Sequence, residues 1–370
     1  MAEMNKPFFD IDKEGVEVVI DSYKKNPEKV LAWHKLFPLK YTPKFDLKGL
    51  EGDEGIPVAA DRVAFNTKAP KKSRKTIGTW SGKLGKYAVS REKDEIQINE
   101  YNDLQVLAAS NEDPSTASYL VNLVYDDVDF CNKAMDYKVE VDAMRIGSSG
   151  KQVFSKEIDG DMATEDVINF NVPEANFKGV ATKWSTASAD GIKDIADAQK
   201  AIAKSGAKKP LFVFMELLAF EHLCAQSKTA SRLFPRVEQS LVTADMINVE
   251  NINAYMRGKG YPQIVVLDTY ATIQAKDGKE NTIKPWNENA VVLSPEDKLG
   301  YTYYKQVPNV PNTDALQVQG PYYKTTRYSE LNPMLEVTMA EAYVQPGLIN
   351  RASLVFLNVE ATTWNDGASK

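Results

Sequence analysis

The sequence has very few of the side chains that carry acid–base, thiol or metal chemistry near neutral pH. Its 370 residues include two cysteines, Cys131 and Cys224, and two histidines, His34 and His222. Two cysteines cannot build a disulfide framework or a cysteine-rich zinc site, and their scarcity suits a reducing compartment. His222 and Cys224 stand two positions apart in a predicted helix, where side chains at that spacing point in different directions. A Cys–His nucleophile pair is therefore not predicted.

Other functional signatures are missing as well. No Walker A motif is present and no Gly-x-Gly-x-x-Gly follows a predicted strand, so nothing indicates a nucleotide site. Asp159-Gly160-Asp161 begins like a calcium loop, but Thr164 replaces its required glycine and Phe170 its required glutamate. No apolar run approaches the about 18 residues of a membrane span, and the N-terminus lacks the plan of a signal peptide. We expect no enzyme activity, no cofactor, no metal and no membrane partner.

The overall composition is that of a folded globular protein. Hydrophobic residues make up 43% of the chain, charged residues 26% and aromatic residues 10%. The 45 basic and 51 acidic side chains give a net charge of -6, so the molecule as a whole would repel duplex DNA. Any contact with nucleic acid is expected to be local and independent of base sequence.

The N-terminal residues 1–55 are predicted to form an extended arm. One short amphipathic segment, residues 16–30, is followed by Pro38 and a series of glycines that block further helix. Apolar side chains such as Trp33 and Phe37 offer more surface than so broken a segment buries alone. We therefore expect the arm to pack on another chain.

Residues 62–98 are predicted to form a long β-hairpin with a glycine-punctuated tip at residues 78–85. Between residues 68 and 91 its charge has one sign, which is unusual in a chain that is acidic overall. The basic residues, with no acidic residue among them, are Lys68, Lys71, Lys72, Arg74, Lys75, Lys83, Lys86 and Arg91.

The strongest helix prediction covers residues 114–146. Asp113 can cap a helix that begins at Pro114, and small or apolar residues then recur at helical spacing as far as Ile146. At 1.5 Å per residue this helix would be roughly 50 Å long, which suits the backbone of a flat or elongated domain. A group of acidic residues on it could recruit a cation, but such a group is more often a solvated or subunit-facing surface. Its members are Asp126, Asp127, Asp129 and Asp136.

The second half of the chain changes to a mixed α/β pattern. Helices are predicted at residues 192–204, 217–224 and 249–257, and strands at 211–215, 263–270 and 290–294. The last two of these strands are expected to form a hairpin through the turn at residues 276–279. A second antiparallel pair is expected at the C-terminus, between residues 335–344 and 353–360.

Two stretches of sequence resemble a known family. Residues 56–66, IPVAADRVAFN, followed by APKKSR at residues 69–74, resemble the strand that enters the extended loop of tailed-bacteriophage major capsid proteins. The likeness is to the lambda capsid protein E family, which has the Hong Kong 97-type fold. YPQIVVLDTY at residues 261–270, the turn Asp277-Gly278 and WNENAVVLSP at residues 286–295 are similar to the hairpin of that family's axial domain.

The resemblance implies an α+β fold with the parts of a Hong Kong 97-like major capsid protein. These parts are an N-terminal arm (1–55), an extended β-hairpin loop (56–100), a peripheral domain (101–185) with the spine helix 114–146, an axial α/β domain (186–330) and C-terminal strands (331–370) that return to the peripheral domain.

The function that the resemblance implies is a shell subunit without catalytic turnover. Such subunits form hexamers and pentamers of an icosahedral bacteriophage head around double-stranded DNA, in the virion, after assembly in the cytoplasm of a bacterial host. The implied partners are further copies of the chain, a separate scaffolding protein, a portal and packaged DNA contacted without sequence preference. A decoration protein is left open.

Subunit interfaces are where the functional residues are then expected, with the basic loop of one subunit meeting acidic helix surface of the next. The expected interface residues are Lys68, Lys71, Lys72, Arg74, Lys75, Lys83, Lys86, Trp33, Phe37, Asp126, Asp127 and Asp129. A solvated or DNA-facing loop remains the alternative for the basic residues. For the whole chain, the alternatives are an encapsulin-like nanocompartment shell and an unrelated soluble α+β binding protein or enzyme.

Overall fold

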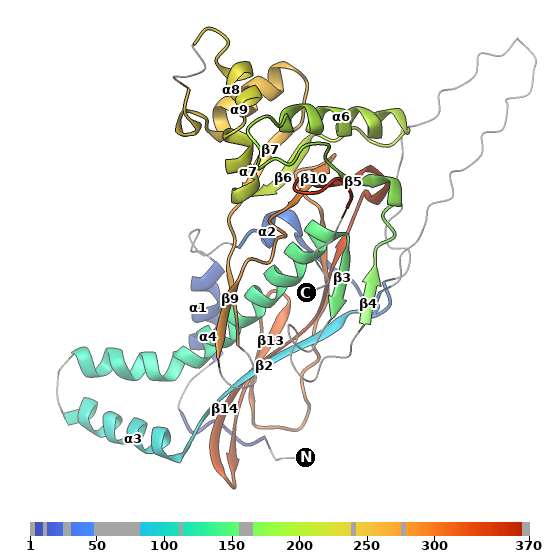
Figure 1. The fold of residues 1–370 in the computed structure, drawn as a ribbon. Coiled ribbons are helices and arrows are strands. Elements are labelled where there is room, and N and C mark those ends of the chain that lie inside the picture. Colours follow the sequence, from blue (N-terminus) through green and yellow to red (C-terminus); the bar gives the residue numbers. More distant parts are fainter. Residues whose placement is uncertain are drawn as a thin grey trace, which may run out of the picture.

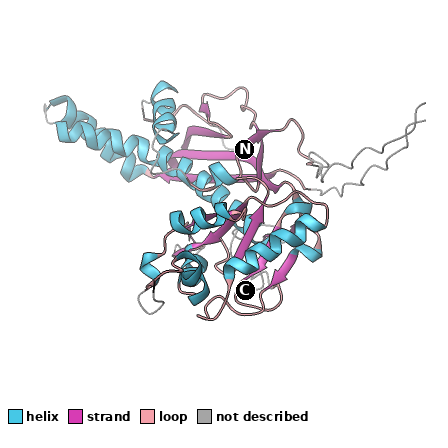
Figure 2. Cartoon of the chain, turned by 90° about the horizontal axis from the view of Figure 1, so that it is seen from above, coloured by secondary structure: helices cyan, strands magenta, loops and turns pink. Residues whose placement is uncertain are grey.

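Two β-sheets organise the chain (Figure 1), and the five-stranded sheet contributes residues to both of the main hydrophobic cores. The computed structural model describes residues 4–9, 13–24, 31–47, 82–110, 114–154, 166–237, 242–274 and 279–364. Seen from above, the two sheets form neighbouring units, while helix α3 and the first part of α4 project from the body (Figure 2). The described part of the chain therefore has the mixed α and β content that the sequence predicted.

The first sheet has six strands and is built around one long central strand, β14 (Met334–Leu348). The strand order is β1-β11-β14-β13-β12, and β2 also pairs with β14. All pairings are antiparallel except that of β1 with β11. The other strands are β1 (Leu39–Tyr41), β2 (Gly85–Lys93), β11 (Gly300–Lys305), β12 (Leu316–Gln319) and β13 (Tyr323–Leu331).

Helix α4 (Pro114–Ser149) packs along this sheet and confirms the predicted spine helix. It begins at Pro114, as expected for a residue whose missing N–H is not needed in the first turn. It ends before Gly150, whose positive φ of 75° and N–H bond to the Ile146 carbonyl terminate the helix. Gly147 lies within the helix and does not end it. A Cβ at this position would lie 3.0 Å from the Trp286 ring, so the close packing there favours glycine.

The second sheet has five strands in the order β5-β15-β10-β6-β7. They are β5 (Phe177–Gly179), β6 (Phe212–Glu216), β7 (Gln263–Leu267), β10 (Ala290–Ser294) and β15 (Val355–Asn358). Four helices belong to this unit, namely α6 (Gly191–Lys204), α7 (Leu217–Cys224), α8 (Ser227–Leu233) and α9 (Val249–Gly258). Every residue of β10 is buried, because Val291 and Leu293 pack in one core and Val292 in the other.

Smaller elements complete the fold. Helix α1 (Lys13–Lys24) packs on α4, and α2 (Trp33–Leu36) lies against it further along. The described part of residues 1–55 thus contains the helices α1 and α2 and the strand β1. Two separate ribbons pair β3 (Lys151–Phe154) with β4 (Asp166–Asn169), and β8 (Ala271–Gln274) with β9 (Glu280–Ile283).

The predicted hairpin over residues 62–98 is only partly described, since residues 48–81 lie outside the described ranges. Strand β2 confirms its second half. The prediction is wrong at the end, where α3 (Glu95–Ser110) begins. Asp94 accepts bonds from the N–H groups of Ile96 and Gln97, and Gln97 accepts one from the N–H of Asp94. This reciprocal capping arrangement starts a helix despite the β-compatible residues nearby.

Two predicted strand pairings are wrong. Residues 263–267 pair in parallel with β6, and residues 290–294 pair with β6 and β15, because the chain between them folds into the β8–β9 ribbon. At the C-terminus, β14 continues through Pro346-Gly347, and β15 joins the other sheet. Beyond Val344 the strand β14 has a partner on one side only, so a residue without an N–H is tolerated there.

Replacing Gly300 with alanine should destabilise the fold, because the added Cβ would lie 2.0 Å from the Gly347 carbonyl oxygen and 2.6 Å from the Phe37 ring. We expect Gly300→Ala to lower the free energy of unfolding by about 1–3 kcal/mol, measured by urea denaturation. Gly258→Ala is the matched control, since a Cβ at this helical position meets nothing within 4 Å. The control should be neutral or slightly stabilising, and equal effects at the two positions would contradict the packing described here.

Candidate subunit interface

Five of the residues predicted to lie at an interface fall outside the described part of the chain. They are Lys68, Lys71, Lys72, Arg74 and Lys75, and their role stays a prediction. The other seven are described, and the structure separates them into buried and exposed groups.

Trp33 and Phe37 lie in the chain's own hydrophobic core and are fully buried. The Trp33 ring stacks on His34 with 3.9 Å between centroids and meets the edge of Tyr322 at 5.6 Å. The two side chains expose no surface through which the expected contact with a neighbouring subunit could act. The apolar surfaces of Trp33 and Phe37 are covered by the same chain.

The two described lysines of the basic hairpin are exposed. Lys83 takes part in an isolated backbone bridge with Asp46, and its side chain is directed to solvent. Lys86 lies on β2 and pairs with Glu341 of β14 at 2.5 Å. The hydrogen bond to that carboxylate raises the pKa of Lys86. Because Lys86 is more than half exposed, this pair contributes little to stability.

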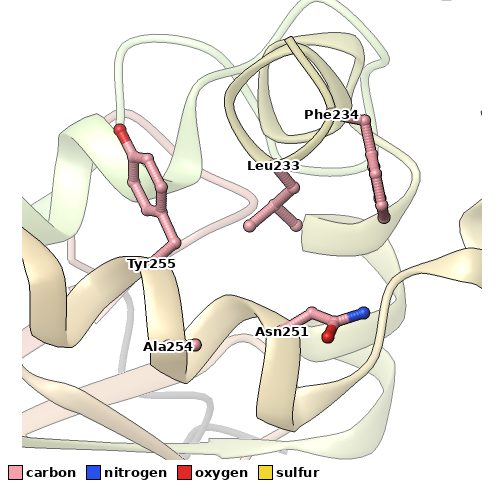
Figure 3. Close-up of a pocket in the computed structure, with 5 residues that line it drawn as sticks. All are labelled: Leu233, Phe234, Asn251, Ala254 and Tyr255. Atoms are coloured by element: carbon pink, nitrogen blue, oxygen red, sulfur yellow. The ribbon is translucent and has the colours of Figure 1, made fainter. Parts of the chain in front are cut away.

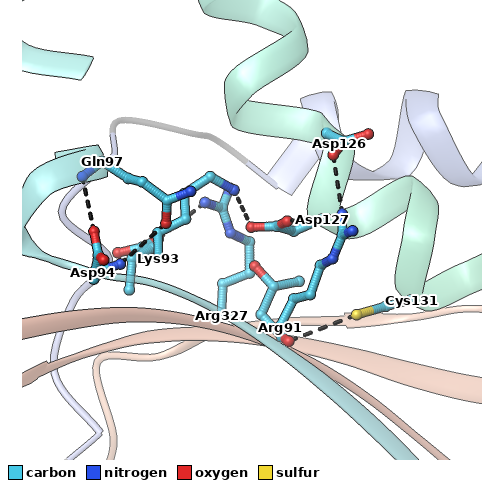
Figure 4. Close-up of polar contacts among 10 residues, drawn as sticks. Arg91, Lys93, Asp94, Gln97, Asp126, Asp127, Cys131 and Arg327 are labelled. Carbon is cyan, nitrogen blue, oxygen red and sulfur yellow. Dashed lines mark hydrogen bonds and ion pairs between the residues drawn. The ribbon is translucent and has the colours of Figure 1, made fainter. Parts of the chain in front are cut away.

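The acidic residues of α4 meet basic residues of the same chain, in what we call the β2–α4 ion cluster (Figure 4). It consists of Arg91 and Lys93 on β2 and of Asp126 and Asp127 on α4. Asp127 is buried, forms an ion pair with Lys93 and lies 3.6 Å from Arg91. Asp126 accepts a bond from Arg91 at 3.0 Å, while its own side chain is 68% exposed.

Two further acidic residues of α4 behave differently. Asp129 pairs with Lys133 one turn along the helix and is about one third exposed. Asp136 is buried and accepts a 2.5 Å bond from the hydroxyl of Tyr322. Buried carboxylates cannot meet the loop of another subunit, so the proposed surface on α4 reduces to Asp126 and Asp129.

A second ion pair of this region, Arg327 with Glu336, was not predicted from the sequence. The two residues lie diagonally across the antiparallel strands β13 and β14, are both buried, and bond at 2.9 Å. Glu336 also accepts the backbone N–H of Phe8 at 2.8 Å, which ties the N-terminal segment to the sheet. Burial raises the pKa of Glu336 and lowers that of Arg327. Lys93 was also missed, although it stands two residues from Arg91 and so shares its face of a strand.

The thiols and His222 were the candidate reactive groups. Burial raises the pKa of Cys131 to about 12 and that of Cys224 to about 11, so both remain thiols. His222 faces Glu360 at 3.3 Å, and the other oxygen of that carboxylate accepts the hydroxyl of Ser185 at 2.7 Å. In the described ranges no three His, Cys, Asp or Glu residues gather to hold a metal, and no helix is long and apolar enough to cross a membrane. The Asp159-Gly160-Asp161 segment lies outside those ranges.

A shallow hollow lies between α8 and α9 (Figure 3). Its volume is about 260 Å³, and its lining residues are Leu233, Phe234, Asn251, Ala254 and Tyr255. It holds no carboxylate, lysine, histidine or cysteine. The hollow lies in the unit of the five-stranded sheet, away from the β2–α4 ion cluster.

Comparison with solved structures identifies the fold. A prophage protein from E. coli CFT073, described as a capsid protein, superposes with a TM-score of 0.57 over 94% of this chain and 99% of its own, at 14% identity. A phage-related protein from Bordetella bronchiseptica RB50 gives 0.52 over 97% and 98%, at 15% identity. No protein-family model and no curated protein matches the sequence. The chain has the Hong Kong 97-like capsid fold, as the sequence resemblance implied.

Breaking the buried pair of the β2–α4 ion cluster should be costly. Lys93→Met leaves Asp127 buried with only Arg91 at 3.6 Å, and we expect the free energy of unfolding to fall by about 3 kcal/mol. The double variant Lys93→Met/Asp127→Leu should recover much of this loss, because no buried charge remains unpaired. Urea denaturation measures both effects. The control is Lys193→Met in the exposed pair with Asp197, where no measurable change is expected.

Proposed function

We propose that the chain is the major capsid protein of a tailed bacteriophage, which assembles into hexamers and pentamers of an icosahedral shell around double-stranded DNA. The observation that carries this proposal is the fold's end-to-end correspondence with a prophage capsid protein, over 94% of one chain and 99% of the other. A correspondence that leaves no domain of that protein unmatched favours a role for the whole chain over a borrowed domain.

A role without catalysis belongs to the same proposal. Both thiols are buried, His222 lies 3.3 Å from Glu360, and Tyr255 is the ionisable residue among those that line the hollow between α8 and α9. Surfaces are then the functional parts of the molecule, as expected for a subunit that repeats its contacts around a closed lattice.

The further partners are part of the same proposal. A separate scaffolding protein, a portal and packaged DNA would meet the shell, and assembly would take place in the cytoplasm of a bacterial host. With a net charge of -6, contact with DNA is expected to be weak and to ignore base sequence. A decoration protein on the outer face stays open.

An encapsulin-like compartment remains the second candidate. The shell protein of a Synechococcus elongatus PCC 7942 encapsulin is similar over 89% of this chain, with a TM-score of 0.39 at 11% identity, a value too low to argue from. The contents of the particles separate the two candidates, because a phage head holds DNA and an encapsulin holds protein cargo.

Negative-stain electron microscopy of the expressed full-length chain, alone and with its scaffolding partner, is the direct test. We expect closed hollow shells of uniform diameter, and DNA in particles taken from infected or induced cells. A chain that stays monomeric by sedimentation at high concentration, with and without the scaffolding partner, would refute the proposal and favour a soluble binding protein.

The basic loop is proposed to bind exposed acidic surface on α4 of a neighbouring subunit. The charge-reversal variant carries Lys71→Glu, Lys72→Glu, Arg74→Glu and Lys75→Glu, and we expect it to abolish shells in sedimentation while circular dichroism stays unchanged. Each exposed ion pair is worth only about 0–1 kcal/mol, but a lattice repeats it and salt should weaken it.

Rescue and control variants make this test specific. Asp126→Lys and Asp129→Lys should partly restore assembly. These two residues are the members of the acidic group on α4 whose side chains are not buried. Reversing Lys200 and Lys204, which are exposed on α6, controls for total charge and should leave assembly intact. Normal shells from the fourfold variant would leave the loop's role to its backbone and apolar residues.

A further inference from the structure

A carboxyl group is buried where helix α2 meets the spine helix α4. Glu140 on α4 is fully buried, and its Oε2 accepts the backbone N–H of Trp33 at 2.8 Å. Its other oxygen, Oε1, has no hydrogen-bond partner among the described residues. Figure 1 shows α2 lying against α4. The carboxyl therefore joins two segments that are 107 positions apart in the sequence.

Aromatic rings close the site. Trp33 lies against His34 on one side and meets the edge of Tyr322 on another. The Tyr322 hydroxyl donates to Asp136, which stands one turn before Glu140 on α4. Two carboxyl groups, those of Glu140 and Asp136, are thus buried in the same region. An ionised Glu140 would have little to compensate for its loss of water.

The charged and titratable groups around Glu140 come from three places. Its own helix provides Asp136, α2 provides the half-exposed His34 and the exposed Lys35, and the segment before β13 provides Tyr322. Burial raises the pKa of Glu140 to about 7, against the lowering effect of the backbone N–H groups of Trp33 and Ala32 and with a further increase from Asp136. Partial burial lowers the pKa of His34, so the two groups shift in opposite directions.

We propose that Glu140 and residues 31–37 form a proton-operated latch between the N-terminal segment and the spine helix. With the carboxyl protonated, α2 stays packed on α4. Loss of the proton favours release of α2, because only the released state lets water reach the carboxylate. The latch belongs to the single subunit and does not depend on the proposed function of the shell.

The direction of the effect follows from the two protonation equilibria. The closed state binds the Glu140 proton up to pH about 7, and a released carboxyl binds it only up to about 4.5, so closure weakens as pH rises between these values. Each unit of difference in pKa corresponds to a tenfold change in the ratio of released to closed states. Between pH 5.5 and 8.5 the same two pKa values give a rise in that ratio of about 30-fold.

Hydrogen–deuterium exchange of the full-length chain tests the latch directly. The N–H groups of Leu36 and Phe37 bond to the carbonyls of Ala32 and Trp33 and so report whether α2 is closed. After correction for the intrinsic pH dependence of exchange, their protection should fall about 30-fold between pH 5.5 and 8.5. The amides of β13 and β14 are the internal reference for global unfolding and should not follow this profile.

Two variants assign the effect to its group. Glu140→Gln keeps an acceptor for the Trp33 N–H but cannot ionise, so its α2 protection should not change with pH. His34→Gln should keep the wild-type profile. If the protection of the α2 amides in the wild-type chain does not change with pH, the proposal is wrong. This measurement needs no variant, so it decides the question even if Glu140→Gln fails to fold. A profile abolished by His34→Gln and kept by Glu140→Gln would overturn it as well.

Discussion

The burial of carboxylates on the sheet-facing side of α4 is the constraint on which the arrangement of the chain depends. A buried carboxylate without a donor or a cation is costly, so each one requires a partner from another segment. Asp127 is paired with Lys93, Asp136 accepts from Tyr322, Glu140 from the backbone of Trp33, and Asp142 from Tyr87 and Lys138. Three separate stretches, in β2, in α2 and before β13, are thereby held at one helix.

Such contacts specify position more than they add stability. A buried ion pair returns little net free energy after desolvation, but a wrong pairing leaves charges unmatched and is strongly disfavoured. The same reasoning applies to Glu336, which joins Arg327 to the backbone of Phe8 at the N-terminus. We take these groups to determine which segment lies where, while the apolar core, with Trp33, Phe37 and Trp286, contributes most of the stability.

The ion pairs and hydrogen bonds within the chain leave few acidic side chains of α4 at the surface. The acidic side of α4 suggested a binding face, but Asp127 and Asp136 are buried and Asp126 is shared with Arg91 of the same chain. In the proposed shell subunit this division separates two tasks, because buried charges define the subunit and exposed charges can form weak contacts that repeat around a lattice.

The sequence by itself determined the local elements whose signals are local. Pro114 and the helical spacing that follows it predicted α4, and the apolar periodicity predicted α6, α7 and α9. Only the tertiary structure decided which strands pair and which polar residues are buried. Residues 263–267 pair with β6, distant in sequence, and β14 and β15 separate into different sheets, because pairing depends on contacts that no local pattern encodes. Asp126 and Asp127 are adjacent and chemically identical, yet one faces solvent and the other Lys93, since only the packing of α4 on β2 distinguishes them.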